Sequence, residues 1–491
     1  MTLGIVLTYI GIAALILTAA TFLVFHQRKN LLVSLLQNFC GALFIFSGWV
    51  KAVDPLGTAY KMEQYFAEFQ ATFSNTAASF LAPLFPWLSN YVNTFSVVMI
   101  ILEIVLGLAL ILGARRKLTA WVFFLIVAFF TFLTGFTYLT GYVPEGVNFF
   151  QFGQWGEYVA TNMKVTDCGC FGDFIKLEPK TSFLKDVALL VPALIFLFKS
   201  GAMHQIFSAG ARSVVLSLAT IGLIAYCFSN YVWDIPHADF RPFKEGVNIY
   251  DQKMREAEAQ QNVEILAYRA TNKESGRVVE IPYDQYLKEY KKYPKEEWEL
   301  EQLKSKAEIE PTKISDFDIS NLNGISVNED ILTIPGPAYM IVAYDLKTNV
   351  SYETITVRDT TYAVDTVAVG DSTQIVRNID AVTDREVQVE RYSWPENYLT
   401  KWTERVVPVL EAARQNGDEA YILTKYAAPE MFAAFSDSIG LEVPIYVGDD
   451  ILLKTIVRSN PGIVLLQDGT IIKKWHYRKL PEFDQIKGDY Y

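Results

Sequence analysis

Cysteine and histidine are both scarce in this chain, with four of each among its 491 residues. The cysteines are Cys40, Cys168, Cys170 and Cys227, so the C-terminal half of the chain has no thiol. Basic residues are outnumbered by acidic ones, which gives a formal net charge of -11 without any basic stripe. A chain of this charge repels phosphate backbones, so we expect no nucleic-acid partner.

Long apolar runs, by contrast, dominate the chain before residue 235. A helix rises about 1.5 Å per residue, so roughly 20 apolar residues cross the ~30 Å hydrocarbon layer of a membrane. Six runs approach this length and predict six transmembrane helices. They lie near Leu3–Phe25, Leu31–Val50, Thr94–Gly113, Leu118–Thr140, Phe183–Phe198 and Val214–Val232.

The short loops between these runs concentrate basic residues, whereas the long loops carry about as many in over three times the length, and this asymmetry predicts the orientation. The basic residues of the short loops are Arg28, Lys29, Arg115, Arg116, Lys117, Lys199 and Arg212. The first run has its positive charges after it rather than before it, which indicates a retained helix and not a signal peptide. We expect a multi-pass protein of the bacterial inner membrane, with membrane lipid around it and with its N-terminus and C-terminal half in the periplasm.

A helical face between the second and third runs gathers Met62, Tyr65, Phe66, Phe69 and Phe73. Two interpretations fit this pattern. The helix lies on the outer leaflet of the membrane, or it is a lid packed on the bundle.

The chain after Trp233 has the composition of a soluble domain. Alternating residues around the segment 272–276 predict a hairpin, and the charged stretch Tyr286–Leu303 predicts a helix. From residue 311 onward strand and helix patterns alternate, which is typical of an α/β layer fold. A period-two pattern around Gly370 predicts a long β-hairpin inserted near residues 351–395.

The stretch Asp167-Cys168-Gly169-Cys170-Phe171-Gly172-Asp173 holds two cysteines one residue apart in a glycine-rich loop. Such a pair forms a structural disulfide, cycles between dithiol and disulfide, or supplies two metal ligands. In an extended segment the two Cα atoms lie near the ~7 Å limit for a disulfide, so the chain must bend at Gly169 and the bridge is strained. Strained bridges are labile, which favours redox exchange.

A metal site is the least favoured of these alternatives, because the outward-facing histidines, His237 and His476, are remote in sequence. Asp167 and Asp173 would raise the pKa of a thiol in this loop, whereas Lys164 or Lys176 would lower it. The spacing alone does not decide between them.

Other polar residues within the apolar runs have weaker assignments. Cys227 lies one turn from the outer end of the sixth run and is a candidate resolving cysteine for the loop. Glu103, in the third run, is costly in a membrane unless it is paired or protonated. It either handles a proton during electron transfer or locks the bundle by a hydrogen bond to Gln37, Asn38 or Ser47. Lys51 and Asp54 are expected to pair with each other at the membrane interface.

The stretch from Gly41 to Phe69, with Ser-Gly-Trp-Val-Lys-Ala-Val-Asp-Pro at its centre, resembles the second-helix signature of the DoxX and MauE membrane proteins. Glu103, Gly107 and Cys168-Gly169-Cys170-Phe171-Gly172 extend this resemblance over about residues 31–198. It implies a four-helix core likened to vitamin K epoxide reductase and a role in disulfide formation, which MauE has in methylamine dehydrogenase maturation. It does not imply that methylamine is handled. No cofactor is evident, and a quinone acceptor follows by analogy only.

The C-terminal segment Ser459–Leu466, followed by Asp468-Gly469, resembles the cis-proline loop and last hairpin of thioredoxin, an arrangement similar to Bacteroidetes-type members of the family. Where the thioredoxin cysteines would follow the strand Tyr339–Tyr344, this chain has Asp345-Leu346-Lys347-Thr348. The resemblance therefore implies a thioredoxin-like domain that binds or scaffolds without thiol chemistry.

The predicted organisation has five parts. They are an additional N-terminal helix (1–30), a DoxX/MauE-like membrane domain (31–200), a sixth helix (201–235), a periplasmic connector (236–310) and a thioredoxin-like domain (311–491). The leading hypothesis is thiol/disulfide exchange with periplasmic client proteins through Cys168 and Cys170. The rival is a non-enzymatic envelope scaffold, and a transporter centred on Glu103 is weaker because no repeat of the two halves is visible.

Overall fold

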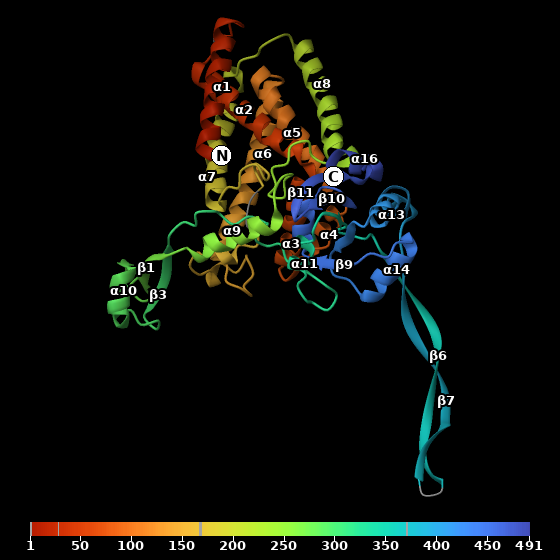
Figure 1. Cartoon of the computed structure of the whole chain (residues 1–491). Coiled ribbons are helices and arrows are strands. Elements are labelled where there is room, and N and C mark those ends of the chain that lie inside the picture. The colour runs from red at the N-terminus through yellow and green to blue at the C-terminus, as the bar shows by residue number, and fades with distance from the viewer. Residues whose placement is uncertain (1, 28, 166–168, 370–371) are drawn as a thin grey trace. The chain divides into compact units, whose positions relative to one another are not determined.

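The structure is a computed structural model that describes residues 2–27, 29–165, 169–369 and 372–491 (Figure 1). It divides into two compact units, Met1–Lys244 and Glu245–Tyr491. The first unit is helical and the second is mixed α/β, so the predicted order of fold classes is confirmed.

Six helices of the first unit are long and apolar enough to cross a membrane, among the described residues. They are α1 (Leu3–Leu23), α2 (Leu31–Val53), α5 (Val92–Leu112), α6 (Arg116–Leu139), α7 (Pro179–Phe198) and α8 (Ala209–Phe228). Each coincides with one of the predicted runs, although α7 and α8 begin earlier than their apolar composition indicates. The chain is therefore a multi-pass membrane protein.

Glycines set the distance between α2 and α5. A Cβ atom on Gly107 would lie 2.7 Å from the carbonyl oxygen of Gly41, and one on Gly48 would lie 2.5 Å from Ile104 Cγ1. Only hydrogen fits at these positions, so the two helix backbones approach closely, as small residues allow in membranes. This contact runs antiparallel and fixes the register of the helix pair.

The amphipathic segment after α2 forms α3 (Pro55–Ser74), which is capped by the Asp54 side chain accepting from Gly57 N–H at 3.1 Å. Tyr65 and Phe69 of α3 are buried in a cluster with Phe136 of α6. Tyr65 also shares a hydrogen bond of 2.7 Å with Thr137. These contacts favour the lid interpretation over a helix resting on lipid.

The predicted basic loops meet at one end of the bundle. Lys29 donates to the carbonyl of Gly201 at 3.4 Å, and Arg116 donates to the same carbonyl at 2.9 Å. Arg116 also donates to Met203 at 3.2 Å. Three loops that are far apart in sequence thus carry their positive charge to the same side of the unit.

The second unit is built on a six-stranded sheet of order β11-β10-β5-β8-β9-β4. Its strands are β4 (Ile319–Ser320), β5 (Pro337–Val342), β8 (Glu419–Thr424), β9 (Ile445–Gly448), β10 (Gly462–Gln467) and β11 (Thr470–His476). β5, β8 and β9 run parallel to one another. β10 runs antiparallel to both of its neighbours, β5 and β11.

Helices complete this unit, which matches the predicted alternation of strands and helices. Before β5 they include α9 (Ile249–Gln261) and α11 (Asn328–Leu332). After β5 they are α12 (Glu396–Lys401), continued by a π-helical turn (Trp402–Val406) into α13 (Val407–Asn416), then α14 (Pro429–Ile439), α15 (Asp450–Ile456) and α16 (Phe483–Tyr490). The peptide bond between Asn460 and Pro461 is cis.

The segment before this sheet differs from its prediction in one element. β1 (Ile265–Asn272) and β2 (Val278–Pro282) form the expected hairpin, but the charged stretch is not one helix. It forms a short helix α10 (Tyr283–Glu289) and then a strand β3 (Trp298–Lys304) that pairs with β1. Pro294 interrupts the predicted helix. The residues after it form a strand instead because the open edge of β1 offers backbone hydrogen bonds, which the sequence pattern alone does not reveal.

A long two-stranded hairpin projects from the α/β unit beside α14 (Figure 1). β6 (Asn349–Val369) and β7 (Ser372–Ser393) pair antiparallel along almost their whole length. The alternating residues around Gly370 predicted this hairpin.

Candidate functional site

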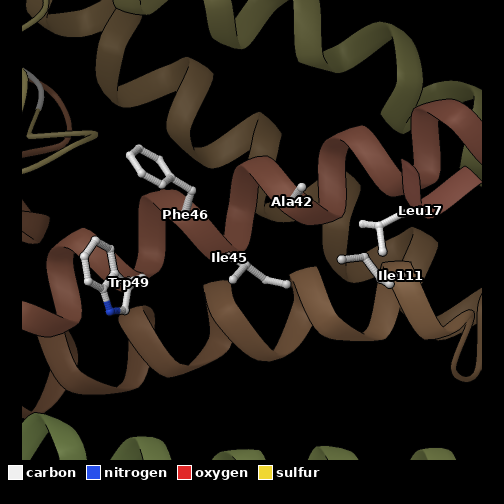
Figure 2. A pocket seen from close by; sticks show the side chains of 6 residues that line it. All are labelled: Leu17, Ala42, Ile45, Phe46, Trp49 and Ile111. Atoms are coloured by element: carbon white, nitrogen blue, oxygen red, sulfur yellow. The ribbon is translucent and has the colours of Figure 1, made fainter. Parts of the chain in front are cut away.

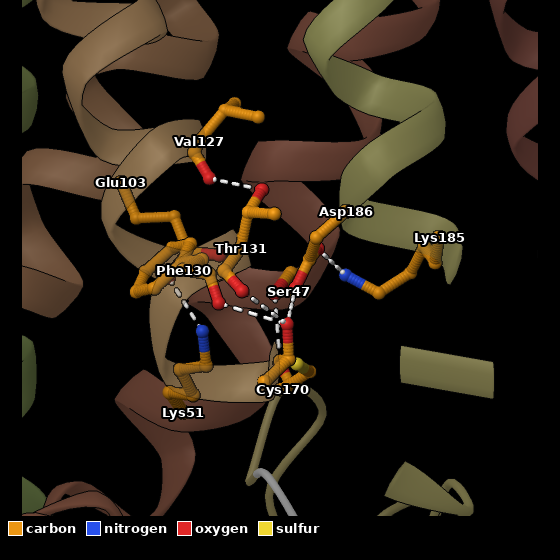
Figure 3. A network of polar contacts seen from close by, with 10 residues as sticks. Ser47, Lys51, Glu103, Val127, Phe130, Thr131, Cys170, Lys185 and Asp186 are labelled. Carbon is orange, nitrogen blue, oxygen red and sulfur yellow. Dashed lines mark hydrogen bonds and ion pairs between the residues drawn. The ribbon is translucent and has the colours of Figure 1, made fainter. Parts of the chain in front are cut away.

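The membrane unit contains a buried ion pair between α2 and α5. Lys51 Nζ lies 2.7 Å from Glu103 Oε2, and the two side chains are 8% and 5% exposed. Lys51 also lies over the ring of Phe130, 5.2 Å from its centroid (Figure 3). The predicted pairing of Lys51 with Asp54 is wrong, because Asp54 caps α3 and the glycine contacts of α2 bring Lys51 to Glu103 instead.

The partners suggested for Glu103 also differ from its observed partner. Gln37 donates to the carbonyl of Leu110 at 2.6 Å, and Asn38 donates to Thr18 at 3.0 Å. Glu103 is therefore paired by a charge rather than by these neutral groups.

A second ion pair lies at the start of α7. Lys185 pairs with its neighbour Asp186, whose side chain is only 2% exposed. Thr134 of α6 donates to the other carboxylate oxygen of Asp186 at 3.0 Å. The sequence interpretation did not single out these two charged residues, although both lie within the fifth apolar run, where charge is costly.

Cys170 lies between these two ion pairs in the view of Figure 3. Its carbonyl accepts a hydrogen bond of 2.8 Å from Ser47 of α2. Gly169 and Gly172 on either side have φ of 61° and 50°, the left-handed region that glycine adopts without strain. The loop bends at the predicted Gly169 and carries Cys170 against the bundle.

The electrostatic surroundings of Cys170 are set by residues far from it in sequence. Burial raises the pKa of its thiol above the ordinary value. The largest charge effects come from Lys185 and then Asp186, followed by Lys51 and Glu103, and the lysines and carboxylates act in opposite directions. The sequence-neighbouring charges, such as Asp173 and Lys176, are not the strongest influences on this thiol.

The other predicted cysteines have different positions. Cys168 lies outside the described residues, so its part in the site stays a prediction. Cys227 is fully buried in a cluster with Ala52, Ile100 and Ile104, whereas Cys170 packs on the cluster that contains Phe171 and Cys40. Cys40, Cys170 and Cys227 are free thiols. A resolving role for Cys227 therefore also stays a prediction.

An apolar pocket of about 360 Å³ lies along α2 (Figure 2). Its walls are formed by Leu17, Ala42, Ile45, Phe46, Trp49 and Ile111. The ring of Phe46 lies 6.0 Å from that of Phe171 and 5.8 Å from that of Phe174. The pocket wall thus continues into the aromatic residues that follow Cys170.

In the α/β unit the loop after β5 carries the carboxylate of Asp345. Lys347 and Lys425 lie 2.7 and 3.2 Å from its carboxylate. Its backbone carbonyl accepts from Asn460 at 2.6 Å and from Tyr398 at 3.2 Å. The loop is thereby tied to the segment that precedes Pro461 and to α12, by polar contacts rather than by thiols.

Comparison with known families finds a match within the membrane unit. A family model described as methylamine utilisation protein MauE matches residues 29–144. No curated protein and no solved structure matches the chain. The matched segment includes α2, α3, α5 and α6, and so contains Lys51 and Glu103 but ends before Cys170.

The chain is thus a multi-pass membrane protein whose residues 29–144 are similar to the MauE family. The family description places such proteins among those of methylamine utilisation.

Proposed function

We propose that this protein exchanges thiols and disulfides with client proteins at the outer face of a bacterial inner membrane, through Cys168 and Cys170. Two client thiolates reduce the loop disulfide, so that the client gains an S–S bond and the loop is left with two thiolates. The resemblance to MauE supports a redox-associated role and carries no claim that methylamine is the substrate.

The observation that carries this proposal is that Ser47, one turn before Lys51 on α2, donates to the Cys170 carbonyl at 2.8 Å, and that the charges of both ion pairs act on the Cys170 thiol. Burying one charge in a membrane helix costs roughly 3 kcal/mol or more, and here four charges gather around a loop. Ionisable groups buried within membrane helices are rare and usually mark functional sites. A loop that served only to connect α6 and α7 would not need them.

The periplasmic orientation is part of the proposal. The basic loops that meet near Gly201 support a cytoplasmic position for that end of the bundle. Cys170 lies in the long loop before α7, which alternates with those loops along the chain. An oxidising compartment on that side would keep the loop disulfide available.

A quinone is the proposed electron acceptor. The apolar pocket bounded by Phe46 and Trp49 supports this assignment, because its wall continues through Phe46 to Phe171 beside Cys170. A second cysteine pair, which related oxidases use between the loop and the quinone, is absent from the sequence. The loop thiols would therefore have to reduce the acceptor directly.

The α/β unit is proposed to be a thioredoxin-like domain that binds the client. Its central strands β5, β8, β10 and β11 have the order and directions of that fold, and helices connect the parallel strands. Because residues 245–491 contain no cysteine, this unit would recognise the client without reacting with it.

Alkylation trapping in intact cells tests the exchange reaction. Free thiols are blocked at the moment of lysis, and the redox state of Cys168 and Cys170 is read by mass spectrometry with and without a pool of client proteins whose thiols are reduced. The loop should be partly reduced, and Cys168→Ser or Cys170→Ser should leave client thiols unoxidised, because neither variant can form the loop disulfide that client thiolates attack. A loop that stays oxidised under all conditions, with client disulfides unchanged in both variants, would contradict the proposal.

The alternative function is a non-enzymatic envelope scaffold. It is favoured by the cysteine-free α/β unit and by its long exposed hairpin. In that case the serine variants would retain the same protein partners in a cross-linking experiment. Deletion of the α/β unit would abolish function, whereas the two serine substitutions would leave function intact.

A further inference from the structure

Two basic side chains from different loops of the membrane unit converge on one backbone oxygen. Lys29, which precedes α2, donates to the carbonyl of Gly201 at 3.4 Å, and Arg116, the first residue of α6, donates to the same oxygen at 2.9 Å. Arg116 also donates to the carbonyl of Met203 at 3.2 Å. The two cations are therefore close neighbours, although 86 positions of the sequence separate Lys29 from Arg116.

Acidic residues are missing from this end of the unit. Residues 24–36, 108–120 and 196–213 contain no aspartate or glutamate, but they contain Arg28, Lys29, Arg115, Arg116, Lys117, Lys199 and Arg212. The ion pairs described in this unit involve neither Lys29 nor Arg116. Loss of hydration, and next the charge of Arg116, lower the pKa of the Lys29 ammonium group. An anion bound beside both groups would offset the repulsion between them.

Arg116 retains hydrogen-bond donors for such an anion. Both of its hydrogen bonds to the loop use Nη1, so Nε and Nη2 have no protein partner among the described residues. The planar guanidinium group matches two oxygens of a phosphate group at once. α6 begins at Arg116 without a side-chain cap, so its first backbone N–H groups add partial positive charge at the same end.

We propose that Lys29 and Arg116 bind the phosphate group of an anionic phospholipid. A lipid fits the surroundings better than a free phosphate ion, because Leu32, Leu118 and Trp121, which follow the two cations on α2 and α6, are each more than half exposed. Both helices are long and apolar enough to cross a membrane, so acyl chains lie against these side chains while the headgroup stays at the interface. This site does not depend on the exchange reaction proposed above.

The test measures lipid binding to the full-length protein in detergent micelles by native mass spectrometry. Phosphatidylglycerol is the probe, and phosphatidylcholine with the same acyl chains is the zwitterionic comparison. The unaltered protein should bind phosphatidylglycerol more tightly and unfold at a higher temperature in its presence. Lys29→Gln/Arg116→Gln should weaken this binding by about fivefold for each cation removed.

A matched control separates a defined site from the overall charge of this end. Arg115→Gln/Lys117→Gln removes two exposed charges that flank Arg116 and should leave the affinity for phosphatidylglycerol nearly unchanged. A neutral micelle has no anionic leaflet, so charges outside the site attract a single lipid only weakly. Lys29→Gln alone breaks one hydrogen bond of 3.4 Å at an exposed residue, so its reduced affinity gives the answer even if the double variant unfolds.

Three results would overturn the proposal. Equal losses of affinity in the two double variants would mean that only the total charge attracts the lipid. Equal affinity of the unaltered protein for the two lipids would mean that the negative charge of the headgroup is not recognised. Inorganic phosphate is the third probe, and if it raises the unfolding temperature as much as phosphatidylglycerol does, the ligand is a free phosphate ion and not a lipid.

Discussion

Lys51 and Glu103 form an ion pair of 2.7 Å across α2 and α5, inside the segment that matches the MauE family model. The pair exists because Gly41, Gly48 and Gly107 let the two helices approach closely and fix their register. The attraction between two charges in the membrane offsets the free-energy cost of their desolvation only when the charged atoms lie close together. The ion pair therefore depends on the close approach of the two helices, which the glycines allow.

Removing one member of the Lys51–Glu103 ion pair should lower the stability of the folded protein. Lys51→Met or Glu103→Gln leaves a buried group without its partner, and we expect each to lower stability by about 3–5 kcal/mol. The double variant Lys51→Met/Glu103→Met removes both charges and should recover most of this loss. Thermal unfolding of the detergent-solubilised protein measures the three variants, and additive losses in the double variant would contradict a paired role.

The glycine contact gives an independent prediction with a matched control. Gly107→Ala places a Cβ atom 2.7 Å from the carbonyl oxygen of Gly41, so α2 and α5 must separate. A Cβ atom on Gly222 of α8 meets nothing within 4 Å. We expect Gly107→Ala to lower the unfolding temperature and Gly222→Ala to leave it unchanged or raise it, because alanine favours a helix by about 1 kcal/mol over glycine. Equal effects of the two substitutions would show that the close approach contributes nothing.

The sequence predicted the membrane helices well because length and apolar composition are local properties. It could not predict the partner of Lys51, since Glu103 is brought to it by helix contacts between distant segments. Lys185 and Asp186 were visible as charges within an apolar run, and the cost of such charges was the signal that could have identified them.

In the α/β unit the strand β3 was missed for a related reason. Its charged residues have a helical appearance when taken alone, and the strand forms because β1 offers an unpaired edge. The two-residue strand β4 (Ile319–Ser320), at the edge of the six-stranded sheet, is defined in the same way, by its pairing with β9. The local residue pattern predicts the central strands, whereas an edge strand forms only where a neighbouring strand offers unpaired backbone groups for hydrogen bonds.

The loop after β5 has a pH-dependent contribution to stability. Partial burial acts against the charge of Asp345, but the hydrogen bonds and charge of Lys347 and the charge of Lys425 outweigh it, so the pKa of Asp345 lies below its ordinary value. A carboxyl group with a lowered folded pKa stabilises the native state above the unfolded pKa, and this stabilisation is lost as the pH falls through the folded pKa.

Asp345→Asn should therefore destabilise the α/β unit by up to about 1 kcal/mol near neutral pH. The difference from the parent protein should shrink as the pH falls below about 3.9 and vanish once the native carboxyl group is protonated. Urea unfolding followed by proteolytic susceptibility of the unit at several pH values measures this difference. Asp316→Asn, at an exposed ion pair with Lys313, is the control. A difference that is constant with pH would show that Asp345 acts through its backbone contacts alone.

The hairpin of β6 and β7 should contribute little to the stability of the sheet from which it projects. Its strands pair with each other, and its ion pairs, such as Arg358 with Asp384 at 3.0 Å and Arg391 with Glu353 at 2.6 Å, are exposed and cross-strand. Replacing Tyr352–Glu390 by Asn-Gly keeps the base of the hairpin and the buried Trp394. Because isolated two-stranded ribbons are marginally stable and lend little to their neighbours, hydrogen exchange of β5 and β10 should be unchanged in the shortened protein. Faster exchange in those strands would mean that the hairpin supports the sheet, whereas unchanged exchange together with loss of function in cells would assign the hairpin to contacts with other molecules.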